Sequence, residues 1–252
     1  CYTETKARVA MNQTKEQMCV LNYEDERLQQ VAKNMSADVF WFSSARELER
    51  GIFLRGEEIV CRDGEEITLC NIHDLKLLGM HNYENVMAAA AIAHGMNVPW
   101  DVIRKVVCEF QAVPHRIEFV KEVNGVKYYN DSKGTNPDAA IKAVEAMVRP
   151  TIVIGGGYDK ESVYDEWIAS FGTKVKSLVL LGQTADKIAE AAAKAGFTAV
   201  TKVDSLEEAV AECARQAQDG DAVLLSPACA SWGMFKNFEE RGRIFKECVN
   251  AL

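Results

Sequence analysis

The sequence lacks several patterns that would assign it to a broad class of protein. No apolar run approaches the ~18 residues that a membrane-spanning helix needs, and no signal-peptide pattern is present. Runs of lysine and arginine are also missing. Together with a net charge of −8 at pH 7, this argues against a general nucleic-acid-binding surface. We therefore expect a cytoplasmic protein that binds neither membranes nor nucleic acid.

Closely paired cysteines are absent as well. The chain has eight cysteines, but none of them forms a C-x-x-C pair. Zinc sites and disulfide frameworks need tighter spacing, so we expect reduced, buried thiols in a cytosolic protein. The chain also has no Met at its start. Because CYTETKARVA reads as part of an amphipathic helix, we expect the chain to be the later part of a longer protein.

What the sequence does have is regular apolar patterning. Hydrophobic residues make up 48% of the 252 residues, enough for one large core or two modest ones. In the first part, strand and helix patterns alternate, and Asp63-Gly64 between two alternating runs predicts a hairpin. Two helices, at 81–95 and 99–110, precede a break near Val113. We place the domain boundary there, with domains at 1–112 and 113–252.

The second part is more regular than the first. After a hairpin predicted at Asn124-Gly125, apolar strands alternate with helices, and the last helix is expected to begin at Trp232. This alternation predicts a mostly parallel sheet with helices on both faces. The fold class is therefore α/β, with an antiparallel patch in the first domain.

Three loops that follow predicted strands carry the polar residues of interest. They are YNDSKGTNPD at 129–138, IGGGYDK at 154–160 and the segment SPACASWGMFKNF at 226–238. Ligands of open α/β sheets bind beyond the carboxyl ends of the strands, so we expect these loops to meet. Lysines, hydroxyl groups and helix ends capped by Asn136 and Ser231 would make a cradle for a small dianion.

Other interpretations of these residues stay open. Each loop alone also fits an ordinary capped or flexible turn, and IGGGYDK is neither a dinucleotide fingerprint nor a P-loop. The pair Asn82 and Asn85 could contact a heteroaromatic edge or simply cross-link a packed helix. Arg116, beside His115, could bind a phosphate or form a structural ion pair.

Taken together, five segments in order resemble the ATP-dependent Mur ligases. They are LGMHNYENVMAAAAIA, VPHRIEFV, YYNDSKGTNPDAAIKA, VIGGGYDK and LLSPACASWGMFKNFEERG. The opening Tyr2-x-x-x-Lys6-x-Arg8 also resembles a helix of the family's central domain, so the resemblance covers essentially the whole chain. It implies that 1–112 is the later part of a central ATPase-type, ATP-binding domain. Residues 113–252 would be a Rossmann-like, doubly wound domain that binds an amino acid.

The resemblance also implies a reaction. It is the ATP-dependent ligation of D-glutamate to UDP-N-acetylmuramoyl-L-alanine through an acyl phosphate, with ATP and Mg²⁺, in peptidoglycan synthesis and hence in cell shape and division. A monomer is expected. The family's P-loop, G-x-x-x-x-G-K-[ST], is absent from these residues, so we expect the chain alone to be inactive. The alternatives are a non-catalytic α/β ligand-binding module, or a related Mur or folylpolyglutamate-type ligase that uses another amino acid.

Individual roles follow from the resemblance in the same way. Lys6, as a carbamate that helps to hold Mg²⁺, and Lys133, beside the transferred phosphoryl group, would be catalytic. The residues implied to contact the nucleotide are Asn82, Asn85, His115, Arg116 and Asp131. The residues implied to line the D-glutamate site are Thr135, Lys160, Ser231, Trp232 and Phe238.

Overall fold

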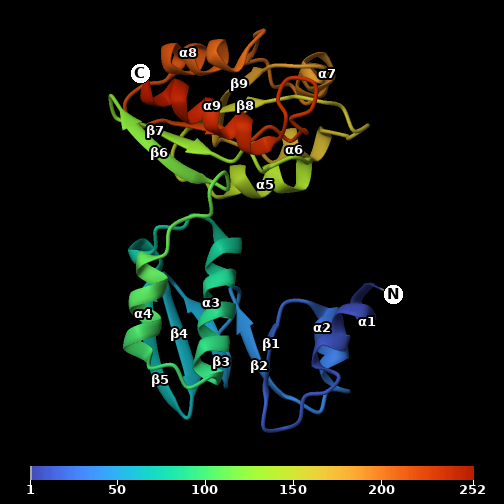
Figure 1. Cartoon of the computed structure of the whole chain (residues 1–252), viewed down its shortest axis with the longest axis vertical. Coiled ribbons are helices and arrows are strands. Elements are labelled where there is room, and N and C mark those ends of the chain that lie inside the picture. The colour runs from blue at the N-terminus through green and yellow to red at the C-terminus, as the bar shows by residue number, and fades with distance from the viewer. Residues whose placement is uncertain (1) are drawn as a thin grey trace. The chain divides into compact units, whose positions relative to one another are not determined.

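The structure is a computed structural model, and it describes residues 2–252. The chain folds into two compact units that divide between Gln111 and Ala112, and each is described here by itself. Each unit contains one sheet and its own set of covering helices (Figure 1). Across the described residues, no helix has both the length and the apolar composition needed to cross a membrane.

The sheet of the first unit has five strands in the order β1-β2-β3-β4-β5. The first three strands run parallel, and β4 is antiparallel to both β3 and β5. The β4–β5 hairpin turns at Gly64, whose φ of 77° suits glycine, as the Asp63-Gly64 pair predicts. The strands are β1 (Met18–Asn22), β2 (Asp38–Ser43), β3 (Gly51–Arg55), β4 (Glu58–Asp63) and β5 (Glu65–Asn71).

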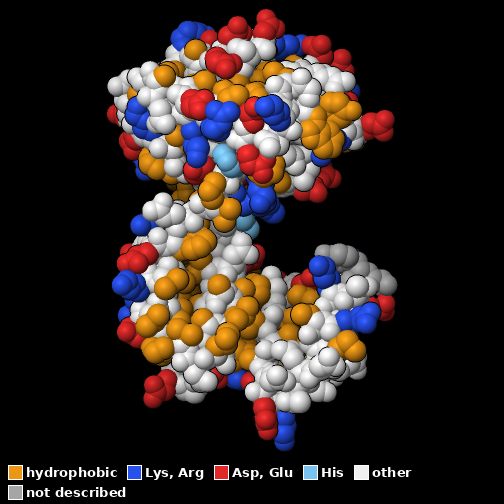
Figure 2. All heavy atoms as spheres, in the orientation of Figure 1, with side chains coloured by type: hydrophobic (Ala, Val, Ile, Leu, Met, Phe, Trp, Pro, Cys, Tyr) orange, Lys and Arg blue, Asp and Glu red, His pale blue; other side chains and the backbone are white. Residues whose placement is uncertain are grey.

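Two long helices of this unit pack against its sheet. Helix α3 lies against β1, β2 and β3, while α4 lies against α3 and β5. The small residues of α3 permit close packing, because Ala90 and Ala91 are buried and Gly95 contacts Met18. Apolar side chains, among them Val106, remain exposed over α3 and α4 (Figure 2). The helical elements are α1 (Tyr2–Ala7), η1 (Arg8–Ala10), α2 (Glu26–Ala32), η2 (Ile72–Asp74), α3 (Met80–Gly95) and α4 (Trp100–Glu109).

The sheet of the second unit has six strands in the order β10-β9-β8-β11-β7-β6. All neighbouring pairs are parallel except β6–β7, which is the hairpin predicted at Asn124-Gly125. The predicted, mostly parallel sheet is therefore confirmed. The strands are β6 (Glu118–Val123), β7 (Val126–Asn130), β8 (Thr151–Gly155), β9 (Val175–Leu180), β10 (Val200–Lys202) and β11 (Ala222–Leu225).

Helices cover both faces of this second sheet. Helices α8 and α9 pack side by side, and their apolar residues form one core with alternate strand residues such as Val223 and Leu225. Helix α6 packs against both α5 and α7. The side chain of Trp167 in α6 lies against Gly155 at the end of β8. The helices are α5 (Pro137–Glu145), α6 (Asp165–Ala169), α7 (Ala185–Lys194), α8 (Leu206–Gln216) and α9 (Phe238–Asn250).

The start of the last helix differs from the expectation. Helix α9 begins at Phe238, and its N-cap is Asn237, whose side-chain oxygen accepts a hydrogen bond from Glu240 N at 2.8 Å. The prediction that Ser231 caps a helix starting at Trp232 is therefore wrong. Residues 232–234 form a turn instead, with Gly233 at a φ of 84°, a conformation that stops a helix from starting there.

Two other local expectations concern caps and cysteines. Asn136 caps α5, since its side-chain oxygen accepts a hydrogen bond from Ala139 N at 2.9 Å, and Pro137 takes the first helical position, as predicted. The described cysteines are free thiols, and five of them are buried: Cys19, Cys61, Cys70, Cys213 and Cys229. Cys1 lies outside the described residues.

Candidate functional site

Three loops meet at one edge of the second sheet. Strands β8, β11 and β7 are adjacent and parallel, so the loops that follow them emerge together at their carboxyl ends. These are the 131–136 loop after β7, the 156–160 loop after β8 and the 226–237 loop after β11. The convergence predicted from the strand pattern is confirmed, and it occurs where open α/β sheets bind their ligands.

Backbone hydrogen bonds join the second and third of these loops. Gly156 N donates to Pro227 O at 2.9 Å, and Tyr158 N donates to Ala230 O at 2.9 Å. The second bond belongs to an isolated antiparallel bridge, so the two loops run alongside each other at this point. Gly156 itself has a φ of 101°, and a Cβ there would overlap the carbonyl oxygen of Leu181. Only glycine therefore fits this close approach.

A buried arginine that the sequence analysis did not identify joins the first and third loops. The guanidinium of Arg241 donates to Ser132 Oγ at 3.0 Å, to Ser132 O at 2.8 Å and to Cys229 O at 3.2 Å. Arg241, Phe245 and Val249 follow each other at intervals of four, so they share the inner face of α9. Burial lowers the pKa of Arg241 to about 10.

Asp131 is the other buried ionisable group of the site. It is 4% exposed; its Oδ2 accepts from Ser226 Oγ at 2.8 Å, and its Oδ1 accepts from Ile117 N at 3.3 Å. A Cβ at Gly134 would overlap Oδ2, so the space beside this glycine is filled by the carboxyl group. Burial raises the pKa of Asp131 to about 7, opposed by the hydrogen bond from Ser226 and the charge of Arg116.

The two lysines of the site are exposed, and each lies over an aromatic ring. Lys133 Nζ is 5.9 Å from the ring centroid of Phe238, and Lys160 Nζ is 4.7 Å from the ring of Trp232. These distances are in the range of cation–π contacts. Such contacts hold the ammonium groups without using their N–H donors, so both remain able to bind an anion.

The hydroxyl residues predicted for the site differ in their access to solvent. Thr135 is half-buried, and its backbone N–H donates to Lys133 O at 2.9 Å. Ser231 is buried, and its carbonyl oxygen accepts from Phe235 N at 3.0 Å. Both lie in loops of the carboxyl edge, as the sequence predicts.

His115 packs against the first turns of α9. Its Nδ1 lies 3.0 Å from Asn130 Nδ2, and its ring makes an edge contact with Phe238. Asn130 Oδ1 accepts from Ser132 N, so the amide nitrogen faces His115 and donates to Nδ1. The imidazole is then neutral with its proton on Nε2, which agrees with a pKa lowered mainly by burial. Gly242 leaves room for this ring.

The backbone around His115 adopts an unusual conformation. His115 has a φ of 66° and Ile117 a φ of 45°, and the second is strained because its side chain is β-branched. Arg116 lies between them with an exposed side chain. The hydrogen bond from Ile117 N to Asp131 holds this turn against the 131–136 loop.

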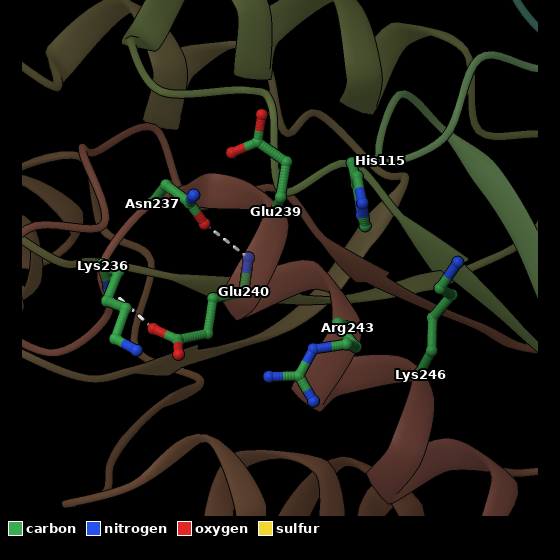
Figure 3. Close-up of a pocket in the computed structure, with 7 residues that line it drawn as sticks. All are labelled: His115, Lys236, Asn237, Glu239, Glu240, Arg243 and Lys246. Carbon is green, nitrogen blue, oxygen red and sulfur yellow. Dashed lines mark hydrogen bonds between the residues drawn. The ribbon is translucent and has the colours of Figure 1, made fainter.

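A pocket of about 450 Å³ opens beside His115 at the start of α9. Figure 3 shows the side chains of both signs that surround it. Glu240 accepts from Lys236 N at 2.7 Å, while Lys246 pairs with Glu118 at 2.9 Å. The lining residues are His115, Lys236, Asn237, Glu239, Glu240, Arg243 and Lys246.

The remaining predicted site residues lie in the first unit. Asn82 and Asn85 are on α3, as their spacing predicts; Asn82 Nδ2 donates to Leu78 O at 2.8 Å, whereas Asn85 is exposed. Lys6 is exposed in the last turn of α1. In the part of the chain that the structure describes, no three His, Cys, Asp or Glu side chains gather as a metal site.

Comparison with known families gives two matches along the chain. The family model described as the Mur ligase middle domain matches residues 1–93, and that described as the Mur ligase, glutamate ligase domain matches residues 115–229.

Curated relatives match the chain over its full length. The UDP-N-acetylmuramoylalanine--D-glutamate ligase of Lachnoclostridium phytofermentans is 57% identical over 252 residues, covering 100% of this chain and 56% of the relative. Those of Lachnospira eligens and Clostridioides difficile are 55% and 46% identical, again with 100% of this chain and 56% of each relative covered. The chain thus spans little more than half the length of these relatives.

Solved structures share the fold at low identity. A MurF structure from Acinetobacter baumannii aligns with a TM-score of 0.68 at 15% identity, over 98% of this chain and 55% of that one. MurF ligase from Thermotoga maritima in complex with ADP aligns with a TM-score of 0.62 at 16% identity, over 98% of this chain and 57% of that one. These likenesses establish the fold alone.

The first prediction concerns the buried guanidinium. Arg241→Met should lower the free energy of unfolding by about 2–4 kcal/mol, because it leaves buried carbonyl and hydroxyl oxygens without a donor. Urea unfolding of the 252-residue chain measures this. Arg243→Met is the matched control, since Arg243 is on the same helix, is exposed and forms a surface ion pair with Glu247. It should change stability by ~0.5 kcal/mol or less. Equal effects of the two substitutions would contradict the role of Arg241.

The second prediction concerns the pH dependence of stability. The pKa of Asp131 is raised from 3.8 to about 7 in the folded chain. The stabilisation of the fold by this group is therefore complete below pH 3.8 and is lost as pH rises through about 7. Relative to Asp131→Asn, the free energy of unfolding should therefore decline between these two pH values. His115, with its lowered pKa, acts in the opposite direction but is common to both proteins. A difference that does not change with pH would refute the prediction.

Proposed function

Because this chain belongs to the Mur ligase family, we propose that it is the nucleotide- and amino-acid-binding part of an ATP-dependent ligase. The proposed reaction joins D-glutamate to UDP-N-acetylmuramoyl-L-alanine through an acyl phosphate. The chain matches the family's middle and glutamate ligase domains but spans only 56% of its relatives, and it contains no P-loop motif. We therefore propose that the chain alone does not catalyse ligation.

The observation that carries this proposal is the cationic edge of the second sheet. Lys133 and Lys160 lie in the loops after β7 and β8, the two strands that flank β11 in one parallel group, and each ammonium rests on an aromatic ring. D-glutamate carries two carboxylates, so an edge with exposed lysines and nearby hydroxyl groups suits it. In the proposal, Lys160, Thr135, Ser231, Trp232 and Phe238 line the amino-acid site.

Lys133 is proposed to act on the phosphoryl group. Its ammonium, on the loop between Asp131 and Thr135, would stabilise negative charge on the phosphoryl oxygens as the carboxylate is activated. ATP supplies the phosphoryl group when it is bound. Backbone hydrogen bonds hold this loop, from Lys133 N to His115 O at 3.0 Å and from Gly134 N to Asp131 O at 2.8 Å.

Five residues are proposed to contact the nucleotide. The side-chain oxygen of Asn82, the exposed amide of Asn85 and the Nε2 proton of His115 are groups that can contact an adenine. Arg116 has an exposed guanidinium for phosphate oxygens. Both oxygens of the buried Asp131 carboxyl already accept hydrogen bonds, so a contact with the ribose would share one of these oxygens.

Mg²⁺ and the carbamate at Lys6 stay predictions. The described residues do not by themselves provide a set of metal ligands, and a carbamate on Lys6 would add one carboxylate-like group. The ligands expected for a magnesium ion would have to be completed by groups beyond these residues and by substrate oxygens. No step of the proposed mechanism is assigned to the metal.

A chimera provides the test of the proposed function. This chain would replace the matching segment of the Lachnoclostridium phytofermentans relative, with the unmodified relative as the control. Phosphate release should then depend on ATP, UDP-N-acetylmuramoyl-L-alanine and D-glutamate together, and L-glutamate should not substitute. A folded chimera that releases no phosphate, while the relative does, would refute the proposal.

Within this chimera, Lys160→Met should raise the KM for D-glutamate at least tenfold with a smaller change in kcat. A charge-assisted contact between the ammonium and a carboxylate is worth roughly 1.5–3 kcal/mol, which corresponds to that factor. Lys127→Met is the control, because Lys127 lies near the opposite end of β7. An unchanged KM in Lys160→Met would remove Lys160 from the amino-acid site.

A further inference from the structure

The side chains around Lys160 determine how its ammonium group is held. The bridge between Tyr158 and Ala230 aligns the 156–160 and 226–237 loops, and it places the rings of Tyr158 and Trp232 with their centroids 5.5 Å apart. The ammonium of Lys160 then lies 4.7 Å from the ring of Trp232. Trp232, a residue that is 54% exposed, thereby supports the ammonium group of Lys160 with its indole ring.

An aromatic ring and a carboxylate hold an ammonium group in different ways. A cation–π contact attracts the ammonium to the face of the indole but leaves its three N–H donors without hydrogen-bond acceptors. An ion pair would hold the ammonium equally well, but it would have to be broken before a substrate carboxylate could bind. The ring of Trp232 therefore restricts the side chain of Lys160 while keeping its donors available.

Of the two carboxylates next to Lys160 in the sequence, Asp159 and Glu161, the first is held by a lysine of another element. Asp159, directly before Lys160, accepts from Lys187 Nζ at 3.1 and 3.3 Å and from Glu161 N at 2.8 Å. Lys187 is on the first turn of α7, and its Nζ lies 5.8 Å from the ring of Tyr164. Asp159 is thus paired with the lysine of another element, and it does not neutralise its own neighbour.

From these contacts we propose that Trp232 and Lys187 are positioning residues for Lys160. Trp232 holds the ammonium toward the amino-acid site, and Lys187 removes Asp159 as a competitor for it. Both residues affect the binding of a substrate carboxylate only through Lys160. The identity of that substrate, D-glutamate, rests on the proposed function. Loss of either residue should weaken amino-acid binding more than it slows the chemical step.

The first arm of the test needs no substrate. In the 252-residue chain, the Cε–Hε resonance of Lys160, identified by its loss in Lys160→Arg, should be shifted upfield by the ring current of the indole. Trp232→Leu should abolish that shift, and Trp232→Phe should retain part of it. A shift that persists in Trp232→Leu overturns the role of Trp232, whatever the reaction catalysed.

The second arm measures kinetics in the active chimera. Trp232→Leu should raise the KM for D-glutamate about two- to fivefold, the range expected for an exposed cation–π contact, with a smaller change in kcat and partial recovery in Trp232→Phe. Lys187→Gln should raise this KM by a similar factor, and Lys187→Arg should restore it.

Lys194→Gln is the matched control for Lys187, because it removes the same charge from an exposed position at the end of the same helix. If Lys187→Gln raises KM no more than Lys194→Gln, the role of Lys187 is overturned. A kcat that falls while KM stays constant would overturn the positioning role of either residue. A chimera that does not use D-glutamate at all overturns the proposed function, and with it the substrate part of this inference. The resonance of Lys160 still decides whether the contact exists.

Discussion

The guanidinium of Arg241 lies where the loops after β7 and β11 meet, and both loops direct oxygen atoms toward it. A charge removed from water must have its donors satisfied, so these oxygens cannot move away independently without a large cost in free energy. The loop with Lys133 and the loop with Trp232 are thereby held at a constant separation. Helix α9 supplies this link because Arg241 lies on its buried face together with Phe245 and Val249.

The charged groups of the site divide into an inner and an outer set. Asp131 and Arg241 are buried, and their hydrogen bonds hold backbone segments together. Lys133 and Lys160 are exposed and rest on aromatic rings, so their donors remain free for a ligand. Rigid inner contacts support outer groups that must exchange water for a substrate, which is the arrangement expected where an anion binds and leaves repeatedly.

Most of the fold was predictable because it depends on local patterns. Apolar strands, the Asp63-Gly64 hairpin and the cap at Asn136 are signals within a few residues, and they place the three loops at one edge. The Ser231 cap was wrong because Gly233 and the stronger Asn237 cap lie just beyond it. Arg241 could not be found in this way, since an arginine on an amphipathic helix is typical of a solvated face, and its burial depends on loops distant in sequence. The roles of individual site residues remain predictions.

Gly134 has a consequence for how this site can change over generations. The carboxyl group of Asp131 occupies the volume that any side chain at position 134 would need. A larger residue at 134 is therefore tolerated only after residue 131 becomes smaller, and that change would also remove the partner of Ser226 and Ile117. The two positions are coupled in the genetic sense, and the effect of a substitution at one depends on the residue already present at the other.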